Sequence, residues 1–280
     1  MPKTWFITGA SRGLGAQIVQ AALRAGDRVV ATGRSRDSLV SRLGADDAQR
    51  LSLELDVTDA DQAQAAVARA LEHFGTIDVL VNNAGYGQLG LFEECTLQDA
   101  QAQFATNLFG VFNVTWAVLP AMRAARKGHV FNVSSLGGMM GAQHMGLYSS
   151  SKFALEGFSE CLWREVAPFG IFVTLVEPGS FRTEFLSGAS LRFGDKPVVD
   201  YDDRRAELRA SFERRDGKQA GDPARLADAI VHLCGVAQPP LRFLAGAAAV
   251  KAVEAKLVRM REEIDRWRTL SVGTDGDPQD

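Results

Sequence analysis

Tyr148 and Lys152 stand four residues apart in the segment LYSSSKFA, which has the pattern of a helix start. Residues at this spacing share one face of a helix, so both side chains can reach a common ligand. A free tyrosine has a pKa near ~10, too high for efficient proton transfer near neutrality. A lysine ammonium nearby favours the phenolate, so we expect Lys152 to lower the pKa of Tyr148. The pair could act as a general acid and base, or it could be an ordinary polar helix surface.

Ser135 makes the chemical interpretation stronger. It follows an apolar run at residues 129–133 and precedes Tyr148 by thirteen residues. In a parallel sheet, the carboxyl end of a strand and the start of the next helix meet in the ligand crevice, so Ser135 and Tyr148 should converge. A serine hydroxyl there could donate to a substrate oxygen while the tyrosine transfers the proton. Ser134 is the rival candidate for this role.

Elements that could hold these residues alternate along the chain. Short apolar runs typical of buried strands alternate with longer segments whose apolar residues recur at helical spacing. The expected strands cover residues 5–8, 28–31, 51–55, 79–81, 129–133, 171–176 and 241–244, and the expected helices cover 15–25, 59–74, 97–126, 148–167, 225–234 and 247–267. Repeated strand–helix–strand units predict an α/β fold: a doubly wound parallel sheet of about seven strands, flanked by helices on both faces.

A glycine-rich turn, TGASRGLG, joins the first strand to the first helix. Gly9, Gly13 and Gly15 would let the backbone turn tightly and approach a pyrophosphate, and the helix N-terminus would supply N–H groups to it. The strand–turn–helix context that this mechanism requires is present. Three residues separate the first two glycines and one separates the last two, which differs from the common dinucleotide fingerprint.

With this glycine spacing, NNAG at residues 82–85 and the Tyr148–Lys152 pair, the chain resembles the short-chain dehydrogenase/reductase family over roughly residues 4–183. The resemblance implies a single Rossmann-type domain that binds a nicotinamide dinucleotide. The cofactor-binding positions that it implies are Gly9, Ser11, Arg12, Gly13, Leu14, Gly15, Arg34, Asp56, Val57, Asn83, Ala84, Gly85, Tyr148, Lys152, Pro178, Gly179 and Thr183. Asp56 and Val57 would contact the adenine ring, although Asp56 could instead cap the next helix. Asn83 could also tie neighbouring strands together.

Charge at the end of the second strand predicts which dinucleotide binds. Enzymes that use NAD commonly have an acidic residue there for the ribose 2′-hydroxyl, whereas this chain reads ATGRS, with Gly33 at that position and Arg34 beside it. A guanidinium can bind a 2′-phosphate, and Arg12 in the glycine turn is a second cation at the same place. Asp37 is the nearest carboxylate and lies on the following helix. We therefore expect NADP(H) to be preferred over NADH.

The family resemblance implies a catalytic set of Asn107, Ser135, Tyr148 and Lys152. Tyr148 would protonate the oxygen of a carbonyl that receives hydride from NADPH, and Ser135 would orient that oxygen. Asn107 interrupts the apolar stripe of its helix, and an unpaired buried amide costs about 1–3 kcal/mol, so it needs a partner. It could mark a helix bend satisfied by water, or hold a water that connects Lys152 to solvent, or both.

The expected domain organisation is one catalytic domain at residues 1–270 with a substrate lid at about 184–221, followed by a mobile polar tail at 271–280. Four arginines of the lid segment are interleaved with acidic residues and predict a solvated, mixed-charge helix. They are Arg204, Arg205, Arg214 and Arg215. The helix expected at 247–267 could also serve an interaction.

The composition limits the classes of molecule that the protein is expected to bind. A net charge of −3 and a sequence pI of 5.9 give no basic footprint for nucleic acid. The three cysteines and four histidines form no metal-ligand spacing, so no metal site is expected. We find no secretory signal and no apolar run of ~20 residues for a membrane span, which predicts a cytoplasmic protein. The family resemblance further implies a homodimer or homotetramer built on the helices at 97–126 and 148–167.

The substrate is predicted only as a class: a small-molecule ketone, aldehyde or alcohol. The residues expected near the pocket are apolar and favour a hydrophobic molecule. They are Met139, Met140, Leu147, Phe181, Phe185 and Leu186, with His144 as either a loop residue or a substrate contact. Two alternatives stay open. A catalytically silent, dinucleotide-sensing regulator could keep the fold, and the extended relatives that act on nucleotide sugars differ in glycine spacing.

Overall fold

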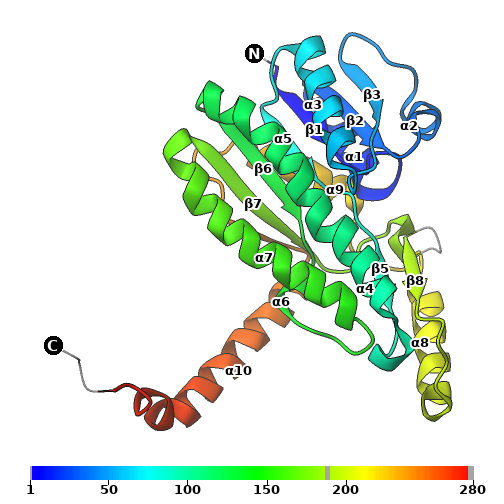
Figure 1. The fold of residues 1–280 in the computed structure, drawn as a ribbon, viewed down its shortest axis with the longest axis vertical. Helices are drawn as coiled ribbons and strands as arrows, with labels where there is room; N and C mark the ends of the chain where they lie inside the picture. The colour runs from blue at the N-terminus through cyan, green and yellow to red at the C-terminus, as the bar shows by residue number, and fades with distance from the viewer. Residues whose placement is uncertain (1, 187–189, 277–280) are drawn as a thin grey trace.

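Seven parallel strands form the central sheet of this computed structural model, which describes residues 2–186 and 190–276 (Figure 1). In spatial order they are β3 (Arg50–Glu54), β2 (Arg28–Gly33), β1 (Thr4–Ile7), β4 (Val79–Asn82), β6 (Gly128–Val133), β7 (Ile171–Pro178) and β9 (Arg242–Ala245). Every neighbouring pair in this order is parallel. The predicted doubly wound parallel sheet is confirmed.

Helices cover both faces of the sheet because each has one apolar stripe to bury. The helices α3 (Ala60–Phe74), α5 (Gly110–Ala125) and α7 (Gly146–Val166) pack on one face. The helices α1 (Gly13–Arg24), α2 (Arg36–Leu43) and α9 (Pro223–Leu233) pack on the other. In α3 the buried residues Ala63, Ala66, Val67, Ala70 and Phe74 follow helical spacing. Asp59 caps its first turn and Gly75 ends it in a left-handed conformation.

The strand order reverses beside β1. The chain passes outward from β1 to β2 and β3, and then crosses back to β4 on the other side of β1. A ligand crevice forms outside the carboxyl ends of parallel strands at such a point. Thr8, Asn83 and Ser134 directly follow β1, β4 and β6. All the predicted motifs therefore lie along one edge of the sheet.

The helix predicted at 97–126 is interrupted. It consists of α4 (Leu97–Phe104), a π-helical turn at Ala105–Phe109, and α5. Such turns are rare and are often found at functional sites. Asn107, inside the turn, is fully buried. The sequence pattern showed the polar residue in the apolar stripe but not the change in helical pitch around it.

Residues Leu97–Ala125 are also long and apolar enough, by length and composition alone, to cross a membrane, with a mean hydropathy of 1.3 over the most apolar stretch. This was not expected from the sequence. In the fold, Val111, Val114, Val118 and Met122 of this run pack into the core, beside α3 and α7. The α5 part of this run therefore belongs to the helical layer that covers one face of the sheet.

The segment expected to be a lid contains the charged helix that its sequence predicts and a strand that the sequence pattern did not reveal. Strand β8 (Leu191–Phe193) pairs in parallel with β5 (Gly87–Leu89), and helix α8 (Asp202–Arg215) follows. Arg205 corrects the expectation of a fully solvated helix, because it forms ion pairs with Glu94 and Asp202 and is mostly buried. Glu94 is itself buried, in the short helix Phe92–Glu94. This ion pair docks α8 onto the body of the molecule.

The last helix, α10 (Ala247–Val272), projects from the body (Figure 1). Its first turns bury Ala249 and Val253, whereas Leu257, Ile264 and Trp267 are exposed. The helix continues to Val272, so the tail expected from residue 271 begins two residues later because regular hydrogen bonding persists. The end of that tail, residues 277–280, lies outside the described residues.

Candidate active site

The glycine turn has the geometry that close contact with a ligand requires. Gly9 and Gly13 have positive φ values of 64° and 53°, a region that other residues rarely adopt. A Cβ atom on Gly15 would lie 2.4 Å from the Gly9 carbonyl oxygen and 2.6 Å from Asn83 Nδ2. Gly15 therefore allows the start of α1 to pack directly against the end of β1. The first N–H groups of α1 are left at the crevice.

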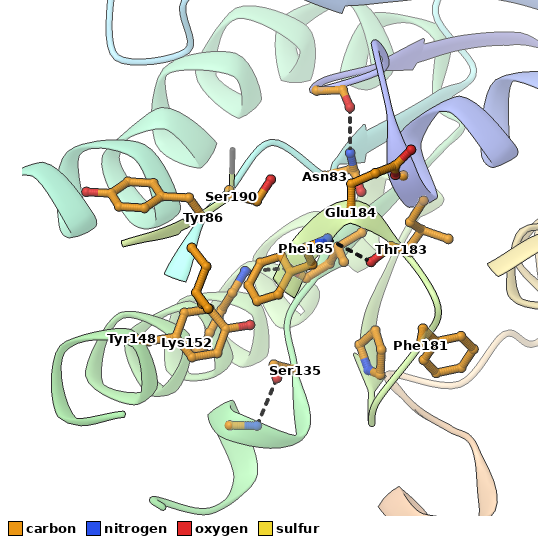
Figure 2. Close-up of a pocket in the computed structure, with 18 of the residues that line it drawn as sticks. Asn83, Tyr86, Ser135, Tyr148, Lys152, Phe181, Thr183, Glu184, Phe185 and Ser190 are labelled. Atoms are coloured by element: carbon orange, nitrogen blue, oxygen red, sulfur yellow. Dashed lines mark hydrogen bonds between the residues drawn. The ribbon is translucent and has the colours of Figure 1, made fainter. Parts of the chain in front are cut away.

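Asn83 joins the ends of β1 and β4, as its sequence context indicated. Its Nδ2 donates to the carbonyls of Thr8 at 2.9 Å and Gly9 at 3.1 Å (Figure 2). The Thr8 hydroxyl oxygen in turn accepts from the backbone N–H groups of Asn83 and Ala84, both at 3.0 Å. This network fixes the two loops that border the crevice.

One large cavity of about 740 Å³ runs along this edge of the sheet. Nearly every predicted cofactor-binding residue lines it: Gly9, Ser11, Arg12, Gly13, Leu14, Arg34, Asp56, Val57, Asn83, Ala84, Gly85, Tyr148, Lys152, Pro178, Gly179 and Thr183. Gly15 is the exception, because its contribution is the close packing described above. The cavity extends from the glycine turn to Ser135 and Tyr148, and residues of the segment expected to be a lid also line it, among them Leu191 and Phe212.

At one end of the cavity, Gly33 and Arg34 follow β2, and Arg12 lines the same space. Arg12 donates to the hydroxyl oxygen of Ser190 at 2.9 Å, which connects the glycine turn to the segment that precedes β8. Asp37, on α2, is absent from the cavity wall formed by described residues. Among the described residues, no carboxylate therefore occupies the position at which an NAD enzyme binds the ribose 2′-hydroxyl.

Asp56 lines this same end and accepts hydrogen bonds from the Thr58 N–H and hydroxyl at 3.0 and 2.8 Å. The helix cap is Asp59, whose carboxylate accepts from Asp61 and Gln62. The alternative interpretation of Asp56 as the cap of α3 is therefore wrong. Asp56 instead shapes the turn between β3 and α3.

Tyr148, Lys152 and Ser135 converge at the other end of the cavity (Figure 2). Tyr148 and Lys152 are 5% and 6% exposed, and the Lys152 ammonium lies 5.9 Å from the Tyr148 ring centre. Lys152 Nζ donates to the Val133 carbonyl at the end of β6, at 2.8 Å. A Cβ atom on Gly137 would lie 3.1 Å from the Tyr148 ring and 3.4 Å from Ser135 Oγ, so both side chains border one small space.

Ser134 and Ser135 both line the cavity, but their hydroxyls differ in whether they are left in a position to act on a ligand. The Ser135 oxygen accepts from the Gly137 N–H at 3.0 Å and caps the short helix α6 (Leu136–Met139), which leaves its proton available to donate. The Ser134 hydroxyl donates instead to buried Glu156. The structure thus favours Ser135 as the serine of the reacting centre.

Burial controls the protonation of the tyrosine–lysine pair in this structure. Burial raises the pKa of Tyr148 to about 12, and its hydrogen bond with Ser135 lowers it by a smaller amount. Burial lowers the pKa of Lys152 to about 8, while the charge of Glu156 raises it. The expected lowering of the Tyr148 pKa by Lys152 is not seen, because desolvation of the phenolate outweighs the other effects and the ammonium is directed to Val133.

Asn107 does not line the cavity but supports its wall. Its Oδ1 accepts from the Tyr86 N–H at 3.1 Å, and its Nδ2 donates to the Tyr86 carbonyl at 3.0 Å and to Ser151 Oγ at 3.2 Å. A Cβ atom on Gly85 would lie 3.2 Å from Asn107 Oδ1 and 3.8 Å from Lys152 Nζ, which places the amide close to the ammonium. The buried amide is therefore satisfied by protein groups and lies beside Lys152.

Apolar side chains gather at the end of the cavity that contains Tyr148. Of the predicted residues, Met140, Phe181 and Phe185 line the cavity, whereas Met139, Leu147 and His144 do not, and the Leu186 side chain lies outside the described part. His144 is a loop residue whose carbonyl accepts from the Gly90 N–H at 2.9 Å. Additional lining residues come from β5, β8, α8 and nearby loops: Tyr86, Leu89, Met145, Leu191, Arg192 and Phe212. Their positions depend on the β5–β8 pairing, which no local sequence signal indicates.

The family model for short chain dehydrogenases matches residues 3–191. The chain belongs to the short-chain dehydrogenase family. As a short-chain dehydrogenase, it is an oxidoreductase of the class that acts on carbonyl and hydroxyl groups with a nicotinamide cofactor. The sequence-based assignment of family and enzyme class is therefore confirmed.

Similarity to individual known proteins supports the assignment to this family. The short-chain dehydrogenase is 40% identical over 277 residues to oxidoreductase BOA17 of Botryotinia fuckeliana, covering 98% of this chain and 100% of that protein. It is 37% identical over 245 residues to the 3-ketodihydrosphingosine reductase of Bacteroides thetaiotaomicron, covering 88% of each. The crystal structure of a short-chain dehydrogenase from Streptomyces avermitilis superposes with a TM-score of 0.89 at 38% identity, covering 99% of this chain and 100% of that one.

Structures of more distant members include one from Burkholderia phymatum in complex with NAD (23% identity, TM-score 0.80, covering 100% of this chain and 98% of that one). Another is ElxO with NADP bound (25% identity, TM-score 0.74, covering 90% of this chain and 100% of that one). Both dinucleotides thus occur on this fold, and the choice between them depends on the residues of each chain.

Proposed function

We propose that this enzyme interconverts a carbonyl and a secondary alcohol with NADP(H), with Tyr148 as the general acid and base. The observation that carries the proposal is the convergence of Tyr148, Ser135 and Lys152 on one wall of the cavity that begins at the glycine turn. A silent dinucleotide sensor would not need these three groups in one place.

The cavity fits a nicotinamide dinucleotide. A Cβ atom on Gly9 would lie 2.8 Å from Ala84 Cα, so this part of the wall is backbone alone, and backbone N–H groups can approach phosphate closely. Arg34 and Arg12 would hold the 2′-phosphate of NADP, and Lys152 would hold the nicotinamide ribose. When bound, the reduced cofactor supplies the hydride.

In the reductive direction, the Ser135 hydroxyl donates to the carbonyl oxygen and orients it. Tyr148 then gives its proton to that oxygen as negative charge develops there. The raised pKa of Tyr148, about 12, keeps the phenol protonated at neutral pH and so favours this role over that of a base. Lys152 would return a proton to Tyr148, and Asn107 would hold a water that connects Lys152 to solvent.

The substrate that fits best is an apolar ketone or secondary alcohol with a long hydrocarbon part. Leu89, Leu191, Met145, Phe185 and Phe212 pack together around Tyr148 and line the far end of the cavity. A relative of this chain is a 3-ketodihydrosphingosine reductase, whose name denotes a long-chain ketone substrate. We propose that residues 184–221 act as a lid over this part of the cavity.

The test is a substrate panel followed by the loss of NADPH absorbance. It contains long-chain 3-ketones such as 3-ketodihydrosphingosine, chain-shortened analogues, aldehydes and, in reverse, the alcohols with NADP. We expect turnover to rise with chain length. NADPH binding without turnover of any carbonyl would support the sensor instead, and a protein that binds neither dinucleotide would refute the proposal.

We further propose a homo-oligomer that pairs the outer faces of α5 and α7. Trp116, Phe153 and Trp163 are exposed there, together with Phe109 from the π-helical turn. Large exposed apolar patches commonly mark protein interfaces. Analytical ultracentrifugation of Trp116→Glu should give a smaller species than the parent protein, and an unchanged sedimentation coefficient would contradict this assembly.

A further inference from the structure

A cluster of buried charges lies directly behind the reacting centre. Glu156 of α7 and Glu177 of β7 are 5% and 0% exposed, and both bind the same guanidinium nitrogen of Arg242 from β9, with Glu177 Oε1 at 2.6 Å. The other guanidinium nitrogen binds Glu160, which is half exposed. Two buried carboxylates around one cation are costly to desolvate, so a structural role alone gives weak reason for them.

The cluster is connected to the loop that carries Ser135. The Ser134 hydroxyl donates to Glu156, and a Cβ atom on Gly138 would lie 2.6 Å from Ser134 Oγ and 2.9 Å from Glu156 Oε1. Arg242 Nη1 also contacts Met139 Sδ at 3.0 Å. Helix α6, which Ser135 caps, is thereby contacted by the cluster near both of its ends.

The same carboxylate also acts on Lys152. Glu156 lies one helical turn beyond it on α7, and both side chains are buried. The other groups that face the ammonium are the Tyr148 ring on α7, the Val133 carbonyl of β6 and the Asn107 amide beside Gly85. Of the described residues, Glu156 is the carboxylate whose charge raises the pKa of Lys152 against the effect of burial.

We propose that Glu156, held by Arg242, is a positioning residue for the reaction: it fixes the serine loop through Ser134 and keeps Lys152 protonated. The inference rests on the proposed function, because it assigns Glu156 to the support of the same tyrosine, serine and lysine. Glu177 and Arg242 keep the carboxylate in place from the neighbouring strands. None of these groups touches the substrate cavity itself except through the residues that they hold.

Glu156→Gln tests this role, with Glu160→Gln as the matched control. Glutamine keeps the shape and can still accept from Ser134 but removes the charge, and Glu160 binds the same Arg242 from an exposed position one turn further from Lys152. If Lys152 must be protonated, turnover falls as pH rises through its pKa. In Glu156→Gln we expect this alkaline limb to move about one pH unit lower, so that kcat at pH 8 falls about fivefold. Glu160→Gln should keep the parent profile.

The proposal is overturned if the alkaline limb of the pH profile stays in place in Glu156→Gln, or if it moves by the same amount in Glu160→Gln. Ser134→Ala supplies a second test should Glu156→Gln not fold: it should lower kcat without moving the limb and speed amide hydrogen exchange in residues 136–140. Amide exchange and turnover that are unchanged in Ser134→Ala would also overturn the proposal. If the parent protein reduces no carbonyl, the proposed function fails, and exchange in Glu156→Gln still tests the hold on α6.

Discussion

Replacing Asn107 by alanine should lower both the stability of the protein and its rate of turnover. The change removes three buried hydrogen bonds, two to the Tyr86 backbone and one to Ser151. Each is worth about 1 kcal/mol, so the free energy of unfolding should fall by roughly 3 kcal/mol, and by more if the Tyr86 groups stay unpaired. For a chain of this size the melting temperature should then fall by about 6 °C or more.

The effect on turnover comes from the position of the amide beside Lys152. Loss of the π-helical turn would let Tyr86 and the Gly85 loop move toward the ammonium, and a displacement of about 1 Å at a reacting centre can cost ~10² in rate. We therefore expect kcat for carbonyl reduction to fall by about 10- to 100-fold, measured by NADPH absorbance under conditions where the variant is folded.

Asn113→Ala is the matched control for this experiment. Asn113 lies on α5, just beyond the π-helical turn, and its amide donates one hydrogen bond, to the Val57 carbonyl at 3.0 Å, at the end of the cavity that Asp56 and Val57 line. The free energy of unfolding of Asn113→Ala should fall by about 1 kcal/mol, and its kcat should equal that of the parent protein. A stable and fully active Asn107→Ala would refute the reasoning, and a less stable variant with parental kcat would restrict Asn107 to a structural role.

Three further changes test other parts of the site. Tyr148→Phe should lower kcat by ~10²–10⁴ while the Kd for NADPH, measured by fluorescence, stays the same; retained turnover would remove Tyr148 as the acid. Arg34→Glu should weaken NADPH far more than NADH, and an equal loss for both would contradict a 2′-phosphate contact. His129, buried against Thr174, has a pKa lowered by burial to about 3, below its unfolded value of about 6.5. The unfolded state therefore binds the extra proton between these values, so stability should fall as pH drops below 6.5. At pH 4.5 this costs roughly 3 kcal/mol, and His129→Gln should flatten the loss in thermal melts. An identical pH dependence in the variant would exclude His129 as its source.

The convergence of Ser135, Tyr148 and Lys152 on one cavity was predictable from the sequence because these residues belong to short local patterns. The glycine turn requires three glycines at fixed places, and Tyr148 and Lys152 must share a helix face. Once the alternation of strands and helices indicates a parallel sheet, the ends of its strands must meet at one edge. Ser135 could therefore be placed near Tyr148 although thirteen residues separate them.

The substrate end could not be predicted in the same way. Strands β5 and β8 have three residues each, and they lie about a hundred residues apart in the chain. Neither is long enough to show a periodic pattern, and their pairing is determined by tertiary contacts. The ion pair between Arg205 and Glu94, which docks α8, spans a similar separation and has the appearance of ordinary surface charge in the sequence.

Protonation is the property that the sequence predicted least well, because it depends on burial and not on spacing. The spacing of Tyr148 and Lys152 suggests an ammonium that lowers the pKa of the phenol, yet both groups are more than nine-tenths buried and each is driven toward its neutral form. A neutral phenol at the end of a cavity is well suited to give a proton to a carbonyl oxygen. A lysine whose pKa is near 8 can exchange protons at physiological pH, provided that a charge such as that of Glu156 keeps it protonated. Under the proposed role of Tyr148, the same burial that removes the expected phenolate suits the proton donation that reduction requires.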